Sequence, residues 1–279
     1  MSEALMRVTG VMKEKYGKDI SVYDSTFLTK SVEKRMMASG NTEMHAYVIY
    51  LMENSVEAEA LFESLHITYS QFFREPLTYA LLEQHVLPQV IAGKPEGSEI
   101  RVWSAGCAGG QEAYSVAMMI SDLAYFSSMD VRYRIIATDI CNASLTYGRT
   151  GKYEPSVLQD VKDKHIKRYF TLQDGIYAIA GPLRKNVSFS YYDLLDTATL
   201  SPPESIFGDF DIVLCCNLLI YYTGELQQFI IQKLKQALAK DGFLITGEAE
   251  RSLVEKHTRL KALSIPPAVF MNRPRSAAI

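Results

Sequence analysis

Residues 100–115 read as a short apolar run, a glycine-rich bend and the beginning of a helix. Gly106, Gly109 and Gly110 lack a Cβ atom, so the backbone can turn sharply there and approach a ligand closely, while the following helix presents free N–H groups. A strand, a glycine turn and a helix in this order are typical of a nucleotide-type cofactor site in an α/β fold.

The spacing of the bend argues against a dinucleotide cofactor. In the pattern G-x-G-x-x-G, the second and third glycines would fall on Ala108 and Gln111, and a ribose-binding acid would follow about 20 residues later. The next acid at the end of an apolar run is Asp139, well beyond that spacing. A glycine-rich first turn and an acid after the second strand fit S-adenosylmethionine, which has ribose hydroxyls but no pyrophosphate.

Composition excludes several classes of protein. The chain has 279 residues, 48% of them hydrophobic, and its formal net charge of −3 gives no overall attraction to nucleic acid or anionic lipid. No apolar run approaches the length of a membrane span, and the first residues lack a signal-peptide core, so we expect a cytoplasmic protein without membrane insertion. The cysteines read as reduced thiols and the scattered histidines as structural or solvated, so we expect no metal site. These residues are Cys107, Cys141, Cys215, Cys216, His45, His66, His85, His165 and His257.

The chain changes its pattern after its first third. Residues 1–66 predict helices, because apolar residues such as Phe27, Leu28, Val32 and Met36, and later Tyr47, Val48, Leu51 and Met52, recur three and four positions apart, with a break at 40–42. From residue 100, strand-like runs alternate with helices. The runs are 100–104, 134–138, 187–190, 211–214, 243–246, 259–263 and 268–271.

These runs predict an α/β domain over residues 100–279, a seven-stranded Rossmann-like sheet of the S-adenosylmethionine methyltransferase type with one reversed strand. The connection between the last two runs is too short for a parallel crossover, so they should pair as an antiparallel hairpin. A small antiparallel β insert is expected at 168–186, around the turn signal Asp174–Gly175. An all-helical N-terminal domain (1–66) and a linker with a connecting helix over the cofactor site (67–99) should precede the sheet.

Five motifs in order resemble the CheR family of chemotaxis-receptor methyltransferases. They are Ser-Gln-Phe-Phe-Arg-Glu75, Ala-Gly-Cys-Ala-Gly-Gly-Gln-Glu-Ala-Tyr-Ser115, Ala-Thr-Asp-Ile140, Gly-Lys-Tyr153 and Cys-Asn-Leu-Leu-Ile-Tyr-Tyr222. The likeness runs from about residue 10 to 272. It implies transfer of the methyl of S-adenosylmethionine to glutamate side chains in acidic receptor helices, giving methyl esters and S-adenosylhomocysteine.

The resemblance also implies roles for single residues. Arg74 would be the active-site arginine at the cofactor, and Tyr221 the tyrosine near the transferred methyl group. Glu112 and Asp139 would be cofactor-binding acids, and Asp193 with Leu194 the adenine-side contact. The remaining cofactor-site positions are Thr68 and Ser70 in the linker, Gly106 in the bend, and Cys216 and Asn217 after the fourth main strand.

The chain departs from the family pattern at several of these motifs. Gln111 and Ala113 stand where the family usually has Glu and Pro, and Gly-Glu-Ala-Glu250 replaces the usual Gly-His-Ser-Glu. Cys216 stands where the family usually has Arg, which removes a cation close to the cofactor pocket. The short β insert resembles family members that do not dock on a receptor's C-terminal peptide tether.

The residues themselves leave alternatives open. Asp139 could simply cap a helix, Glu112 could simply complement a helix dipole, and Tyr221 could be a packing residue. The β insert could be an ordinary structural hairpin. Two other functions remain: methylation of a different signalling protein, or a cofactor-binding scaffold with reduced activity.

Substrate docking is only weakly indicated. Lys30, Lys34 and Arg35 lie at helical spacing and could form a basic stripe for acidic receptor helices. Residues 1–66 hold seven basic and ten acidic side chains, so an ordinary solvated helix face is an equal alternative. We expect a monomer.

Overall fold

The computed structural model describes residues 2–95, 97–127, 129–205 and 208–273. The chain forms two compact units: the residues up to 67 together with 220–227, and residues 68–219 together with 228–279. We expected 220–227 to lie inside the methyltransferase domain, but they join the helical unit. The Asp24 amide donates to the Tyr221 carbonyl at 2.8 Å, and the rings of Tyr23 and Tyr222 stack with centroids 5.5 Å apart.

The first unit is helical, as predicted. Its helices are α1 (Glu3–Tyr16), α2 (Ser25–Ala38), α3 (Met44–Glu53) and α4 (Ser55–Ser64). Side chains of Ser2, Asp24 and Asn54 accept backbone N–H groups at the starts of α1, α2 and α4, which satisfies donors that a helix leaves free. The predicted apolar positions Leu28, Val32 and Leu51 are buried, but Met52 is 46% exposed because it lies on the outer face of α3.

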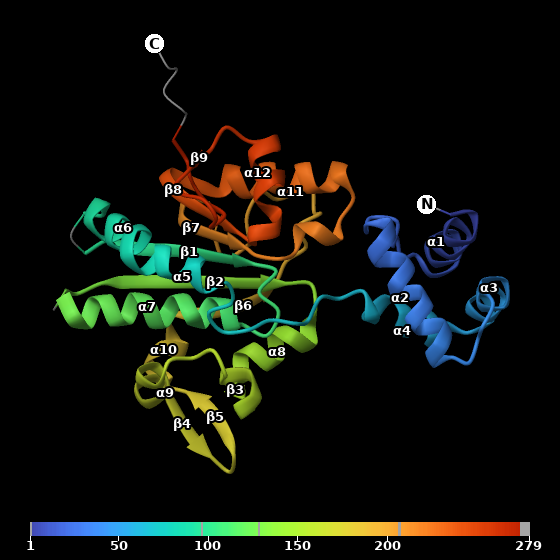
Figure 1. The fold of residues 1–279 in the computed structure, drawn as a ribbon, viewed down its shortest axis with the longest axis horizontal. Helices are drawn as coiled ribbons and strands as arrows, with labels where there is room; N and C mark the ends of the chain where they lie inside the picture. The colour runs from blue at the N-terminus through green and yellow to red at the C-terminus, as the bar shows by residue number, and fades with distance from the viewer. Residues whose placement is uncertain (1, 96, 128, 206–207, 274–279) are drawn as a thin grey trace. The chain divides into compact units, whose positions relative to one another are not determined.

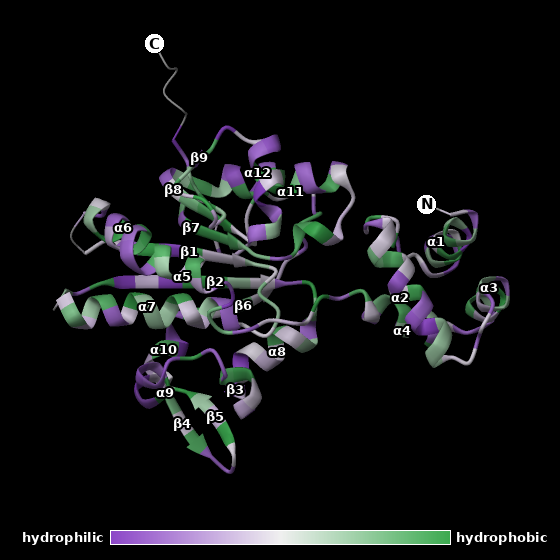
Figure 2. Ribbon diagram, in the orientation of Figure 1, coloured by the Kyte–Doolittle hydropathy of each residue, from purple (hydrophilic) through white to green (hydrophobic). Residues whose placement is uncertain are grey.

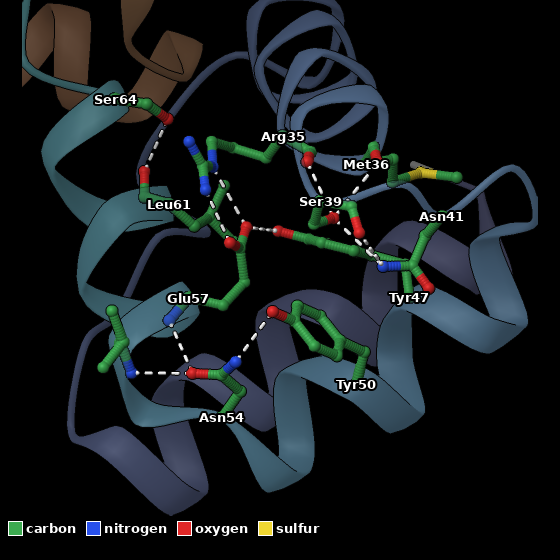
Figure 3. A network of polar contacts seen from close by, with 11 residues as sticks. Arg35, Met36, Ser39, Asn41, Tyr47, Tyr50, Asn54, Glu57, Leu61 and Ser64 are labelled. Atoms are coloured by element: carbon green, nitrogen blue, oxygen red, sulfur yellow. Dashed lines mark hydrogen bonds and ion pairs between the residues drawn. The ribbon is translucent and has the colours of Figure 1, made fainter.

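A buried ion pair ties α2 to α4 (Figure 3). Arg35 donates from Nε and Nη2 to Glu57, at 3.0 and 2.5 Å, and the Tyr47 hydroxyl donates to the same carboxylate at 2.8 Å. Glu57 is only 4% exposed, and a buried carboxylate is stabilised by such a counter-charge. Arg35 is therefore engaged inside the unit and does not extend a basic surface stripe, whereas Lys30 and Lys34 are exposed.

The second unit is built on a seven-stranded sheet in the order β6-β2-β1-β7-β8-β10-β9. The strands are β1 (Glu99–Ala105), β2 (Arg132–Asp139), β6 (Val187–Tyr191), β7 (Phe210–Cys215), β8 (Leu238–Thr246), β9 (Lys261–Ala262) and β10 (Val269–Met271). Strand β10 runs antiparallel to both neighbours, and the other pairs are parallel. The predicted seven strands, the single reversed strand and the closing hairpin are confirmed.

Helices surround the seven-stranded sheet, and α9 lies beside the small β insert (Figure 1). They are α5 (Pro76–Leu81), a π-helical turn (Leu82–Val86), α6 (Leu87–Gly93), α7 (Gln111–Ser127), α8 (Asn142–Thr150), α9 (Asp163–Tyr169), α10 (Gly181–Lys185), α11 (Gly224–Ala237) and α12 (Arg251–His257). Helix α7 contacts both β2 and α10, and it is hydrophobic along most of its length (Figure 2) because it is covered on more than one side. Short 3₁₀ turns lie at Pro155–Leu158, Leu219–Tyr221 and Glu248–Glu250.

The predicted β insert is present, with corrections to its extent. Strands β4 (Phe170–Gln173) and β5 (Ile176–Ile179) pair as an antiparallel hairpin around Asp174 and Gly175, which have φ angles of 50° and 80°. A third strand, β3 (Lys152–Tyr153), pairs with β5 and was not predicted. The first residues of the expected insert end helix α9, and its last residues form α10.

In the part of the chain that the structure describes, no helix combines the length and the apolar character needed to cross a bilayer.

Candidate active site

The candidate active site lies where the parallel strands end. Gly106 follows β1, Asp139 ends β2, Asp193 follows β6, and Cys216 follows β7. Strands that run parallel present their carboxyl ends at one edge of a sheet, and ligands of open α/β sheets bind outside that edge. The topology therefore gathers residues that are far apart in the sequence.

The glycine bend has the conformation that its sequence predicts. Gly106 and Gly110 have φ angles of +72° and +85°, which side-chain-bearing residues rarely adopt. A Cβ atom on Gly106 would lie 2.6 Å from the Leu218 side chain, and one on Gly110 would lie 2.6 Å from the Phe189 ring. The bend is thus packed on both sides and fixed in position at the start of α7.

Asp139 fastens the bend to the second strand. Its Oδ2 accepts the Ala108 N–H at 2.9 Å, and its Oδ1 accepts the Cys141 N–H at 2.8 Å. Ala108 is itself held at a φ of 45°. The carboxylate therefore has a structural part in shaping the loop.

Glu112 is a buried carboxylate in the first turn of α7. It is 8% exposed, and the Ser104 hydroxyl donates to its Oε1 at 2.7 Å. Burial raises the pKa of Glu112 above its ordinary value, although hydrogen bonds from the Cys216 thiol and from Ser104 act in the opposite direction. The thiol of Cys216 thus contacts the Glu112 carboxyl.

The loop at 72–75 is attached to the rest of the second unit at three points. Phe72 is fully buried and meets the rings of Tyr153 and Phe170 edge-on, at centroid distances of 5.0 and 5.7 Å. The Phe73 N–H donates to the Ser115 hydroxyl at 3.0 Å. Glu75 accepts from the Asn217 side-chain amide at 3.1 Å and from the Glu248 N–H at 3.1 Å.

These attachments hold the loop at 72–75 in an unusual conformation. Phe73 and Glu75 have φ angles of 51° and 62°, which cost energy in residues with a Cβ atom and persist only where the surroundings impose them. Phe73 also stacks on His165, with ring centroids 5.1 Å apart. Phe72 and Phe73 thus pack against the rest of the unit, and the backbone at Arg74, which lies between Phe73 and Glu75, is held on both sides.

Arg74 is half-buried, and its guanidinium lies 5.5 Å from the centre of the Tyr69 ring. Among the described residues no carboxylate lies within 4.0 Å of it, so its charge is not used in an ion pair. Its positive charge opposes the rise in the pKa of Glu112, with a smaller effect than burial, the hydrogen bonds from Cys216 and Ser104, and the charge of Glu75. Arg74 and Glu112 therefore belong to one electrostatic site.

Glu75 and Glu250, for which we predicted no role, hold the residues after β7 in place. Glu250 is fully buried, and its carboxylate accepts the N–H groups of Asn217, Leu219 and Gly247, at 2.9, 2.6 and 2.9 Å. Asn217 has a φ of 56°, and a Cβ on Gly247 would meet its side chain at 2.4 Å. Glu75 and Glu250 both stand in motifs quoted above, but their partners could not be read from the sequence.

The other predicted positions lie in different surroundings. Leu194 is buried, and Asp193 accepts the Leu195 N–H at 2.8 Å, so this pair forms a turn directly after β6. Thr68 is exposed and Ser70 half-buried. Tyr221 belongs to the first unit, where its ring meets Phe27 edge-on at 4.8 Å, so its packing role is observed and its catalytic role stays a prediction.

The residues present fit the positively charged S-adenosylmethionine. Glu112 is buried without a cation at ion-pair distance among the described residues, and the side-chain oxygen of the adjacent Gln111 is buried without a hydrogen-bond donor. A buried anion and a buried acceptor of this kind favour a ligand with cationic and N–H groups. The described residues contain no group of His, Cys, Asp and Glu side chains that could hold a metal ion, and the four cysteines are free.

Comparisons with known proteins show the family of the chain. The family profile described as "CheR methyltransferase, SAM binding domain" matches residues 68–269. The chain is 27% identical over 253 residues to a chemotaxis protein methyltransferase of Borreliella burgdorferi, covering 89% of this chain and 88% of that one. It is 30% identical over 204 residues to the chemotaxis protein methyltransferase Cher2 of Pseudomonas putida, covering 72% and 70% of the two chains.

A third relative is much longer. An uncharacterized 104.1 kDa protein of Rhodobacter capsulatus is 28% identical over 279 residues, so this chain spans 28% of that protein's length. The matched profile covers more than half of the chain, and the chain therefore belongs to the CheR family of S-adenosylmethionine-dependent methyltransferases.

Proposed function

We propose that this methyltransferase transfers the methyl group of S-adenosylmethionine to glutamate side-chain carboxylates of methyl-accepting chemotaxis receptors, giving glutamate methyl esters. The observation that carries the proposal is the guanidinium of Arg74, which is fixed by its backbone and not engaged in an ion pair among the described residues. A planar guanidinium can hold a carboxylate by two parallel hydrogen bonds. Two relatives named as chemotaxis protein methyltransferases support the receptor as the substrate class.

The chemistry asks little of the protein beyond positioning. A glutamate carboxylate has a reference pKa of about 4.3, so at neutral pH it is already an anionic nucleophile and needs no general base. When bound, S-adenosylmethionine supplies an electrophilic methyl group on a sulfonium. Arg74 would orient the carboxylate. The buried aromatic side chains packed against its loop would keep the loop rigid, which favours alignment of the reacting groups.

The cofactor side of the site would be formed by the residues after the strands. We assign Asp139 to the ribose hydroxyls, Glu112 to the positive charge of the methionine part, and the turn at Asp193 and Leu194 to the adenine side. The remaining cofactor contacts would come from the linker, the glycine bend and the residues after β7. These residues are Thr68, Ser70, Arg74, Gly106, Cys216 and Asn217. Tyr221 would act beside the transferred methyl group.

Substrate docking would involve acidic receptor helices meeting the exposed Lys30 and Lys34 on α2. The protein would act as a cytoplasmic monomer. Since Arg35 is paired internally with Glu57, the basic surface is smaller than the sequence suggests. That observation favours a second candidate function, methylation of a carboxylate on a different signalling protein. The neutral Cys216 beside Glu112 favours a third, a cofactor-binding scaffold with reduced activity.

The proposal is tested by incubating the purified protein with methyl-labelled S-adenosylmethionine and receptor-containing membranes, followed by alkali treatment. Methyl esters release volatile labelled methanol in alkali, and we expect this label with the wild type and not with Arg74→Ala. Label that is stable to alkali would contradict the ester. An absence of volatile label from a protein that binds S-adenosylhomocysteine would favour the scaffold.

A further inference from the structure

A cavity of the methyltransferase unit lies at the edge of the sheet, beside β6. It has a volume of about 400 Å³ and is lined by the end of α8, by α10 and by β6, with Tyr114 of α7 at its base. Helices α8 and α10 both contact β6, as Figure 1 illustrates. The residues that line it include none of those assigned above to the cofactor or to the substrate.

Three of the seven lining residues are cations, and none is an acid. The cations are Arg149, Arg184 and Lys185, and all three are exposed. No ion pair within 4.0 Å involves any of them in the described part of the chain, whereas Arg251 at the other end of the sheet pairs with Glu255 at 2.9 Å. Like charges held together without a counter-ion repel one another, and an anion between them would relieve this repulsion.

The two arginines are held in place by backbone carbonyls. Arg149 donates from Nη2 to the Phe189 carbonyl at 2.9 Å, and Arg184 donates from Nη2 to the Arg149 carbonyl at 2.8 Å. Each guanidinium has five N–H donors, so these contacts fix its orientation and leave further donors for a ligand. The carbonyl of Phe189 belongs to the edge strand, and its capping by Arg149 disfavours pairing with an added peptide strand there.

The shape and charge of the cavity indicate the class of ligand. A phosphate monoester carries a charge near −2 and three strong acceptor oxygens, which match three separate cations, whereas a single carboxylate is satisfied by one arginine. Val187, Phe189 and Tyr114 give an apolar and aromatic wall, and the volume lies in the range of small-molecule sites. We propose that this cavity binds a small phosphorylated ligand of nucleoside monophosphate size.

The test is calorimetric titration of the full chain with adenosine 5′-monophosphate, with saturating S-adenosylhomocysteine present to block the cofactor site. Adenosine and inorganic phosphate serve as probes of the two parts of the ligand. We expect the monophosphate to bind and adenosine not to bind. The double variant Arg184→Gln, Lys185→Gln should weaken binding about ten-fold or more, since charge-assisted hydrogen bonds are lost.

Two further variants keep the result interpretable. Lys185→Gln alone removes a side chain with no hydrogen bond or ion pair in the described structure and should still weaken binding several-fold. Lys240→Gln removes one positive charge on β8, which is separated from β6 by three strands, and should leave binding unchanged. Binding of inorganic phosphate with the same dependence would also support a phosphate site.

Three results would overturn the proposal. The first is no binding of either phosphate-containing probe to the wild type. The second is equal binding to the wild type and to the double variant. The third is displacement of the monophosphate by a hexaglutamate peptide at a lower concentration, which would identify an acidic protein segment as the ligand.

Discussion

Arg74 and Glu112 are opposite charges in one site with different surroundings. Arg74 is half-buried on a loop that three attachments hold, and Glu112 is almost fully buried in the first turn of α7. A cation on a flexible loop would lose conformational entropy each time it bound a substrate. In the observed loop, part of that entropy is already lost when the protein folds. The two residues should therefore respond differently to substitution.

Arg74→Lys should separate catalysis from cofactor binding. Lysine keeps the charge but lacks the planar fork, so we expect kcat to fall about ten- to a hundred-fold. The affinity for S-adenosylhomocysteine, measured by calorimetry, should change by less than about three-fold, since charge is conserved. Arg132→Lys, at the exposed start of β2, is the matched control and should match the wild type. Equal losses of binding and turnover in Arg74→Lys would contradict the assigned role.

Glu112→Gln should change the pH dependence of stability. Burial raises the folded-state pKa of Glu112 above its unfolded value, so its contribution to stability is present at low pH and is lost as pH rises through the folded pKa. Without ligand, the Gln variant should therefore gain Tm relative to the wild type as pH rises from acid to neutral. Parallel Tm profiles would show that Glu112 does not titrate in this way.

The same substitution should affect ligand binding in the opposite sense. The α-ammonium group of the ligand favours the ionised carboxylate, so wild-type affinity for S-adenosylhomocysteine should rise with pH over the range in which Glu112 ionises. Glu112→Gln should bind more weakly at neutral pH and lose that dependence. Calorimetric titrations at several pH values measure both effects, and an unchanged pH dependence in the variant would remove Glu112 from the cofactor site.

At the scale of elements, the glycine bend depends on its fit against α8 and β6. Gly110→Ala would require an alanine at a φ of +85° and would place a Cβ 2.6 Å from the Phe189 ring. We expect destabilisation of about 2–4 kcal/mol in urea unfolding, from the strained backbone and the overpacked ring together. Gly93→Ala, with no atom within 4 Å of the added Cβ, is the control and should be neutral or slightly stabilising. Equal effects of the two substitutions would contradict this account of the bend.

In the helical unit, the buried pair between α2 and α4 should matter more than the neighbouring surface charge. Arg35→Met leaves the Glu57 carboxylate buried without its counter-ion and should destabilise the unit by about 3 kcal/mol, measured by urea unfolding. Lys34→Met changes an exposed charge on the same helix and should stay within about 0.5 kcal/mol of the wild type. A similar loss in both variants would mean that helix propensity, rather than the pair, accounts for the effect.

At the scale of the whole molecule, the sequence predicts regular elements better than it predicts their contacts. The seven strands and the hairpin at Asp174–Gly175 follow from alternation and turn signals that lie within short windows. Strand β3 was missed because two residues carry no periodicity. The pairing of Arg35 with Glu57 was missed because the two residues come from different helices.

The candidate site follows the same division. The glycine bend and Asp139 could be located because each stands directly after an apolar run. The structural roles of Glu75 and Glu250 could not be predicted in this way. Glu75 accepts hydrogen bonds from Asn217 and Glu248, and Glu250 accepts one from Asn217, across long stretches of chain. Such contacts depend on the folded topology, which a single sequence does not display.

The most direct test of carboxyl methylation is mass-spectrometric mapping of a purified receptor cytoplasmic fragment after incubation with the protein and S-adenosylmethionine. We predict added methyl groups on specific glutamates, removable by mild alkali and absent when those glutamates are replaced by alanine or when Arg74→Ala is used. Methyl groups on other side chain types, or none on the fragment while the protein binds S-adenosylhomocysteine, would contradict the account.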